Sequence, residues 1–251
     1  MKNPFSDKFV HPLGGELTDR LCRIAGRFRD GDGGCHGPDH AGRVYRTALY
    51  IGRMMGAQLD VLAAAALLHD IGRRFEKEQQ GRICHAAKGA ELAHEILQDL
   101  DFEADKIAAI IHCIESHRYR GDKIPTTLEA KILYDADKLD SIGAIGIGRA
   151  FLFAGQVGAK LHNSDVDPAV THPYSTEDTA YREFRVKLSK VKNRLLTLEG
   201  RRLAQERHAF MEVFFERLDR EVNGAEGQEN RPASETVAAS SRGGEHQTCP
   251  P

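Results

Sequence analysis

The chain has 251 residues, of which 41% are hydrophobic and 29% charged, a composition typical of a globular protein with a buried core. Its formal net charge of −2 excludes an overall basic field of the kind that attracts nucleic acid. The N-terminal stretch lacks the apolar segment of a signal peptide, and the longest apolar run, residues 61–68, is too short to span a membrane. The five cysteines form no CxxC pair and suggest no zinc knuckle or disulfide framework, which favours a cytoplasmic location.

Apolar residues recur at steps of three and four along most of the chain, which predicts helices. Pro38 is suited to open the second helix and Gly56 to end it, while Asp60 can cap the third. The expected helices cover residues 17–28, 38–55, 61–71, 85–97, 103–117, 128–151, 184–198 and 203–218. Residues 161–175 are expected to form a surface excursion between them.

The last 29 residues, 223–251, differ in composition from the rest of the chain. They contain no Leu, Ile, Phe or Met and are rich in Gly, Ser, Glu and Pro, which predicts a disordered tail. No segment shows the alternation of a strand. The sequence therefore predicts an all-α protein, with a single helical bundle over residues 1–222 followed by the tail.

The segment LLHDIG (67–72) ends an apolar helix with adjacent His69 and Asp70. A buried imidazole and carboxylate need partners. A divalent ion is one such partner, since it binds both groups. The alternative is that His69 caps the helix and Asp70 pairs with an arginine.

Two other segments bring similar side chains. His40, in HAGRV (40–44), is expected to point inward from the first turn of its helix. The segment DADKLDSIGAIG (135–146) places Asp135, Asp137 and Asp140 on an otherwise apolar helix, with Asp137 directed into the core. Three carboxylates on the walls of one core need a counter-charge, which a metal ion or a basic side chain can supply.

Together HxxRV, LLHDIG and DADKLDSIGAIGIGRAF resemble the motifs of the HD-domain metal-dependent phosphohydrolase superfamily, over about residues 15–222. This resemblance implies an HD phosphohydrolase domain over residues 1–222. It also implies the metal ligands, which are His40, His69, Asp70 and Asp137. The DADKLDSIGAIG segment and ERHAFM (206–211) more narrowly resemble the bacterial branch that includes YedJ- and YpgQ-like proteins. Members of that branch are associated with hydrolysis of nucleoside triphosphates to the monophosphate and pyrophosphate.

The implied ligand set suits one divalent metal per chain, Mn, Ni, Fe or Mg. Two histidines and two carboxylates leave open positions on a six-coordinate ion, where water becomes acidic and a phosphoryl oxygen can coordinate. His85 and His117 resemble the histidines that bind a second metal in some HD branches. The favoured alternative is that they orient water or contact a phosphate. His117 or Asp140 could supply a proton, so the catalytic candidates are His85, His117 and Asp140.

Basic residues beside the motifs are candidates for binding substrate phosphates. Arg43 and Lys138 are favoured over Arg73 and Arg74, and a structural or solvated role is the alternative for each. The GAIGIG run does not follow a strand and has the wrong glycine spacing for a dinucleotide fingerprint.

The leading hypothesis is a nucleotide-acting (d)NTP pyrophosphohydrolase. The alternatives are a phosphomonoesterase of the 5′-nucleotidase kind or a cyclic nucleotide phosphodiesterase. A non-catalytic nucleotide-binding sensor is a further alternative, which the intact set of four ligands disfavours. The expected partner is a small nucleotide substrate. Neither nucleic acid nor a membrane is expected as a partner, and the chain could form a homodimer.

Overall fold

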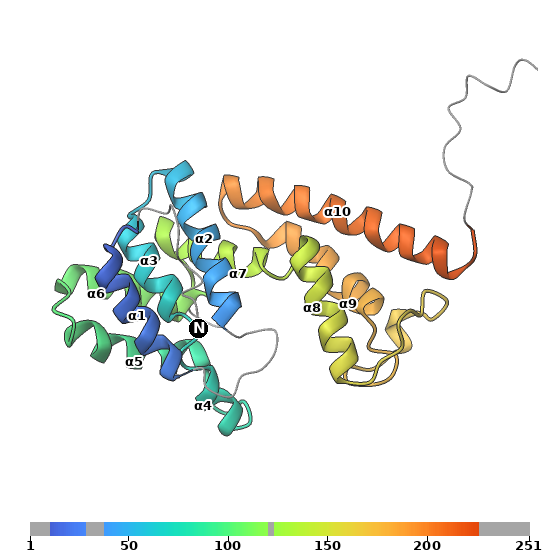
Figure 1. Ribbon diagram of the computed structural model, residues 1–251, viewed down its shortest axis with the longest axis horizontal. Coiled ribbons are helices and arrows are strands. Elements are labelled where there is room, and N and C mark those ends of the chain that lie inside the picture. The colour runs from blue at the N-terminus through green and yellow to red at the C-terminus, as the bar shows by residue number, and fades with distance from the viewer. Residues whose placement is uncertain (1–10, 29–37, 120–122, 226–251) are drawn as a thin grey trace, which may run out of the picture.

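The computed structural model describes residues 11–28, 38–119 and 123–225 (Figure 1). Within these ranges the regular elements are all helices, which confirms the all-α prediction. None of them is both long and apolar enough to cross a membrane. The α-helices are α1 (Gly15–Arg27), α2 (Pro38–Met55), α3 (Leu59–Leu68), α4 (Arg73–Glu78), α5 (His85–Gln98), α6 (Ala104–Ser116), α7 (Leu128–Leu139), α8 (Gly143–Gln156), α9 (Ala180–Val186) and α10 (Leu198–Val222). Two 3₁₀ helices are η1 (Pro168–Val170) and η2 (Leu188–Arg194).

Helix α3 is the centre of the larger group of helices. Every residue from Val61 to Leu68 is buried, as expected for a helix that is apolar on all sides. It packs against α1, α2, α6 and α7, and its four consecutive alanines let these neighbours approach closely. Because α3 is surrounded, the residues that follow it, His69 and Asp70, begin in the interior.

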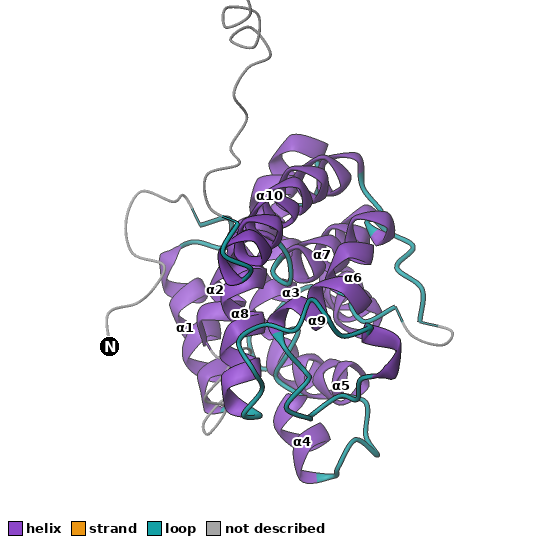
Figure 2. Ribbon diagram, turned by 90° about the vertical axis from the view of Figure 1, so that its right-hand side faces the viewer, coloured by secondary structure: helices purple, strands orange, loops and turns teal. Residues whose placement is uncertain are grey.

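Helix α10 joins the two parts of the molecule. In Figure 1, α1–α7 lie together on one side, α8 and α9 lie on the other, and α10 runs along both. It packs against α2 and α7 in the first group and against α8 and η2 in the second. Figure 2 shows α4 and α5 at the end of the molecule opposite α10.

The predicted helix over 128–151 is wrong in its middle. Helix α7 ends at Leu139 and α8 begins at Gly143, which has a φ of +75° that side chains rarely adopt. Ser141 also donates through Oγ to the carbonyl oxygen of Lys138, which closes the end of α7. The two helices therefore meet at a turn that contains Asp140.

Three other boundaries also differ from the prediction. The apolar face expected over 184–198 is divided between α9, η2 and the first residue of α10. Helix α3 begins at Leu59, so Asp60 lies in its first turn, where it pairs with Lys106 at 2.8 Å. Short helix α4 was not predicted. Of the predicted tail, residues 226–251 lie outside the described residues.

Asp135 does not face the same space as Asp137, contrary to the sequence-based expectation of three acids around one counter-charge. Its buried carboxylate accepts from the backbone N–H groups of Leu196 and Thr197, both at 2.8 Å, and from Thr197 Oγ1 at 2.7 Å. A Cβ at Gly200 would meet this carboxylate. Asp135 therefore joins α7 to the start of α10.

Candidate metal centre

His69 and Asp70 lie in the interior at the end of α3, with 0% and 3% of their surfaces exposed. His69 Nδ1 lies 2.8 Å from the carbonyl oxygen of Ala66, which can only accept, so this nitrogen donates. In neutral His69 the remaining nitrogen, Nε2, then has a lone pair directed at its neighbours.

Two groups lie beside His69 Nε2. His40 Nε2, from the first turn of α2, lies 3.4 Å from it, and Asp70 Oδ2 lies 3.5 Å from it. His40 Nε2 is also 3.4 Å from Asp137 Oδ1 and 3.5 Å from Asp70 Oδ2. The ligand atoms of His40, His69 and Asp137 all lie within 4.8 Å of one another and could hold a metal ion.

The other oxygen of Asp70 belongs to a second group. Asp70 Oδ1 lies 3.4 Å from His85 Nε2 and 3.6 Å from His117 Nε2, and these two nitrogens are 3.2 Å apart. Asp70, His85 and His117 could likewise hold a metal ion. We call His40, His69 and Asp137 the first cluster and Asp70, His85 and His117 the second cluster. One carboxylate, that of Asp70, faces both.

Several observations fit a cation at this position. Asp70 Oδ1 is buried and has no hydrogen-bond partner within the described residues, although a buried carboxylate oxygen normally has one. Donor atoms spaced at 3.2–3.6 Å are close to the roughly 3 Å edge of an octahedron with bonds of about 2.1 Å. Imidazole nitrogens and carboxylate oxygens are the donors that divalent transition metals prefer.

The pKa values show the same demand for positive charge. Burial alone would lower the pKa of His40, but hydrogen bonds with Asp137, Asp140 and Asp70 outweigh burial and raise it to about 10. Burial is the main cause that lowers the pKa of His69 to about 3 and that of His85 to about 4. Without a metal, the carboxylates therefore keep His40 in its doubly protonated, positively charged form at neutral pH, while the imidazoles of His69 and His85 stay neutral.

Asp140, a sequence-based candidate proton donor, supports His40 instead of facing the clusters. Its Oδ2 lies 2.7 Å from His40 Nδ1, and its carboxylate accepts from Arg43 Nε at 2.6 Å and from Arg149 at 2.6 Å. Although burial opposes ionisation, these partners keep the pKa of Asp140 below its usual value. An ionised carboxylate with three such donors has no proton to supply at neutral pH.

Three of the four candidate phosphate-binding cations pair with an acid of the site. Arg43 pairs with Asp140 as described, Arg73 Nε donates to Asp70 Oδ2, and Lys138 Nζ donates to Asp137 Oδ2 at 2.9 Å. About a quarter of each side chain is exposed, at 26%, 23% and 28%. Arg74, by contrast, pairs with exposed Glu78 at the surface. The three cations therefore line the edge of the clusters and partly neutralise them.

Other histidines have separate roles. His94 is exposed, His112 accepts from Thr126 N–H at 3.1 Å, and buried His208 pairs with Glu212 at 3.2 Å. These contacts do not involve either cluster.

The sequence analysis missed Glu76, Arg118 and Arg149. Glu76 lies on α4 and contacts His85 Nδ1 and Arg118. Arg149 lies inside the quoted GAIGIGRAF segment, yet only the turn between α7 and α8 brings it to Asp140. Glu76 carried no spacing signal because α4 was not predicted, and Arg118 lies just beyond the end of α6, outside any helical pattern.

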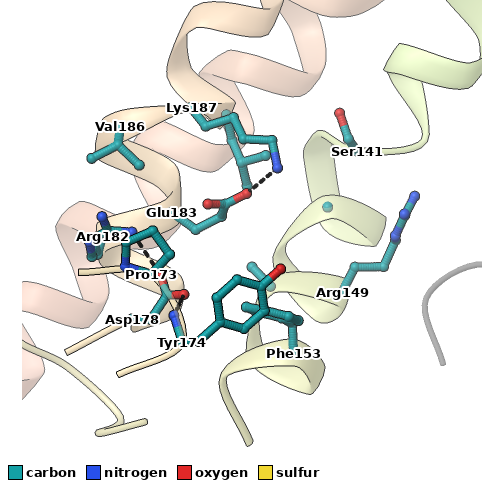
Figure 3. Close-up of a pocket in the computed structure, with 13 residues that line it drawn as sticks. Ser141, Arg149, Phe153, Pro173, Tyr174, Asp178, Arg182, Glu183, Val186 and Lys187 are labelled. Carbon is teal, nitrogen blue, oxygen red and sulfur yellow. Dashed lines mark hydrogen bonds and ion pairs between the residues drawn. The ribbon is translucent and has the colours of Figure 1, made fainter. Parts of the chain in front are cut away.

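A cavity of about 540 Å³ lies between α8 and α9. Figure 3 shows Glu183, Lys187 and Tyr174 around it, with the Arg149 guanidinium turned away from Tyr174. No residue of the two clusters lines this cavity. The cavity is therefore separate from the candidate metal centre.

Comparison with known proteins identifies the family. The family described as HD domain matches residues 39–142. Protein YpgQ of Bacillus subtilis (strain 168) is 34% identical over 203 residues, which are 77% of this chain and 87% of YpgQ. Ribonuclease Y of Chloroflexus aurantiacus is 37% identical over 92 residues, but these are only 16% of that enzyme.

Solved structures agree. The crystal structure of B. subtilis YpgQ in complex with ADP has a TM-score of 0.65 at 28% identity, covering 86% of this chain and 98% of YpgQ. An HD-superfamily hydrolase from Bacillus thuringiensis has a TM-score of 0.66 at 26% identity, covering 83% of this chain and 97% of the hydrolase. With its similarity to YpgQ over 77% of its length and its two His/Asp clusters, the chain belongs to the HD-domain family and is a metal-dependent phosphohydrolase.

Proposed function

We propose that the protein hydrolyses nucleoside or deoxynucleoside triphosphates to the monophosphate and pyrophosphate. The observation that carries this proposal is the convergence of four imidazoles and two carboxylates on one buried space, where Asp70 Oδ1 lacks a hydrogen-bond partner among the described residues. A nucleotide is supported as the substrate class by the ADP complex of YpgQ, a relative 34% identical in sequence. The pyrophosphohydrolase reaction is supported by the resemblance of the DADKLDSIGAIG segment to the branch associated with that reaction.

We propose His40, His69, Asp70 and Asp137 as the ligands of one divalent ion such as Mn²⁺. When bound, such an ion acidifies water and offsets negative charge on a phosphoryl group. The second cluster presents His85 and His117 to the same space, where they can bind a second ion or a phosphate. The metal content of the purified protein distinguishes the two roles: two ions per chain would indicate a second metal at His85 and His117, and one ion would favour phosphate binding there.

The neighbouring side chains hold the ligands and the substrate. We propose that Asp140 is a positioning residue for His40 and that Arg43 holds Asp140 in place. These roles replace proton donation by Asp140 and phosphate binding by Arg43, which the sequence suggested. Lys138 and Arg73 are partly exposed at the edge of the clusters, and we propose that they stabilise the charge of the leaving pyrophosphate. Pyrophosphate leaves with little protonation, so this reaction does not depend on a strong acid in the site.

Hydrolysis of a dNTP with Mn²⁺ in ¹⁸O-labelled water tests the proposal. Label in the nucleoside monophosphate is expected. Label in orthophosphate would indicate a phosphomonoesterase, hydrolysis of a cyclic nucleotide alone would indicate a phosphodiesterase, and binding without product would indicate a sensor. Each of these three outcomes contradicts the proposed reaction.

A matched pair of variants tests the ligands. Asp70→Ala is expected to lose metal and activity together, because Asp70 faces both clusters. Glu95→Ala, at an exposed acid on α5, should keep both. Full metal occupancy in the Asp70→Ala protein would show that the ligand assignment is wrong.

A further inference from the structure

Glu76 on α4 lies between two residues that are far from it in sequence. His85 Nδ1 lies 2.6 Å from Glu76 Oε2, and Arg118 Nη1 donates to Glu76 Oε1 at 2.6 Å. His85 begins α5 and Arg118 follows α6, so the three side chains join three separate elements. Each oxygen of the Glu76 carboxylate therefore has a different partner.

The four histidines of the clusters differ in what holds Nδ1. His69 and His117 donate to carbonyl oxygens three residues earlier, those of Ala66 and Ile114, at 2.8 and 2.7 Å. The local backbone supplies these acceptors whatever the neighbouring side chains are. His40 and His85 instead depend on the side-chain carboxylates of Asp140 and Glu76.

The two carboxylates are not held equally. The side chain of Asp140 is 4% exposed and accepts from both Arg43 and Arg149. That of Glu76 is 22% exposed, and among the described residues Arg118 is the cation paired with it. His85 therefore has the support that is most sensitive to a single substitution.

The contact with Glu76 determines which nitrogen of His85 carries the proton. A carboxylate ionised at neutral pH only accepts, so Nδ1 donates and neutral His85 keeps the lone pair on Nε2. That nitrogen lies 3.4 Å from Asp70 Oδ1, which has no hydrogen-bond partner in the part of the chain that the structure describes. Without Glu76, the other tautomer would satisfy both atoms, because Nε2–H could donate to Asp70 Oδ1. The second cluster would then lose two of its three ligand atoms to each other.

We propose that Glu76, anchored by Arg118, is a positioning residue that fixes the His85 tautomer and keeps the second cluster available to a ligand. The inference rests on the proposed function, in which that cluster binds an ion or a phosphate. It adds a side chain of α4 to the supports of the site. In this arrangement the Glu76 carboxylate accepts from His85 on one oxygen and from Arg118 on the other.

Nitrogen-15 NMR of the imidazoles in the metal-free protein tests the tautomer directly. The wild-type protein is expected to show His85 protonated on Nδ1, with the signal assigned by its loss in His85→Gln. Glu76→Ala should shift the proton to Nε2. Glu76→Gln, which keeps the size and one acceptor, should give a smaller shift. Glu78→Ala is the matched control, because Glu78 is an exposed acid on the same helix that pairs with Arg74.

A calorimetric titration with Mn²⁺ alone gives the second measurement. Glu76→Ala should weaken Mn²⁺ binding about 10- to 100-fold, the usual effect of removing a residue that orients a metal ligand. Arg118→Met should weaken it less, because Glu76 remains but is no longer anchored. Thermal melting shows whether each variant is folded. If Glu76→Ala does not fold, the Mn²⁺ affinities and His85 signals of Glu76→Gln and Arg118→Met test the role of Glu76.

Unchanged His85 signals and Mn²⁺ affinity in the Glu76 variants would overturn the inference, while a wild-type protein that hydrolyses dNTPs would leave the proposed function standing. Conversely, a wild-type protein without hydrolysis would refute the proposed function. The tautomer in the metal-free protein would still decide the role of Glu76.

Discussion

Replacing Asp135 with alanine removes the carboxylate that joins α7 to the start of α10. Three donors lose their acceptor: the N–H groups of Leu196 and Thr197, and the hydroxyl of Thr197. Leu196 is partly exposed and its N–H can bind water, whereas Thr197 is 4% exposed and its N–H stays unpaired. A buried unpaired donor costs about 1–3 kcal/mol, and each lost bond to a charged group costs about 1.5–3 kcal/mol.

The full sum is not expected, because burial is the main influence on the pKa of Asp135 and raises it. The ionised carboxylate therefore already costs free energy in the folded state, which offsets part of its hydrogen bonds. We expect Asp135→Ala to lower the free energy of unfolding by about 3 kcal/mol.

Urea denaturation followed by circular dichroism measures this loss. Glu216→Ala, at an exposed acid on α10, is the control and should change the free energy of unfolding by less than about 0.5 kcal/mol. Metal content and turnover of the folded Asp135→Ala protein should match those of the wild type, since Asp135 contacts neither cluster. Loss of metal with unchanged stability would refute this reasoning and return Asp135 to the metal centre.

Three further predictions concern the fold. Gly72→Ala should lower the free energy of unfolding by about 3 kcal/mol or more in the same assay, because its Cβ would meet the backbone of His85 and Gly89. Gly26→Ala, which has open space in α1, should be neutral or stabilising, and equal effects of the two would contradict the packing argument. Burial raises the pKa of Tyr45 to about 12, so the protonated hydroxyl contributes stability that is fully present below pH 10 and is lost as the pH rises through 12. Tyr45→Phe should therefore flatten the fall in melting temperature between pH 10 and 12. An unchanged slope of melting temperature against pH would contradict this explanation. Deleting residues 226–251 should leave melting temperature and turnover unchanged, because that segment lacks core-forming residues, and a large drop in either would show that it docks on the helices.

The sequence predicted the helices and the main side chains of the site because both depend on short-range patterns. The inward direction of His40 follows from its place in the first turn of an amphipathic helix, and the interior position of His69 and Asp70 follows from the apolar run that they end. Contacts between distant segments cannot be predicted from helical spacing. Asp135 and Asp137 are both expected in a core, and only the position of Thr197 shows that they serve different purposes.

The remaining errors have a similar origin. The break between α7 and α8 depends on Gly143 adopting a positive φ, in a segment whose other small residues, such as Ala144, are compatible with a continuous helix. Glu76 reaches His85 only because the chain turns back after α4. Helical periodicity contains no information on such a turn.

Helix α10 has a consequence for folding during synthesis. It covers α2 and α7, which lie earlier in the chain, and residues just before it provide the donors for Asp135. While the ribosome has released only α1–α9, the face of α7 that α10 covers is exposed and Asp135 lacks these partners. At about 5–20 residues per second, synthesis of the 25 residues of α10 takes roughly one to five seconds. During that interval the nascent chain exposes surface that chaperones and proteases can bind, and its core closes only after α10 emerges.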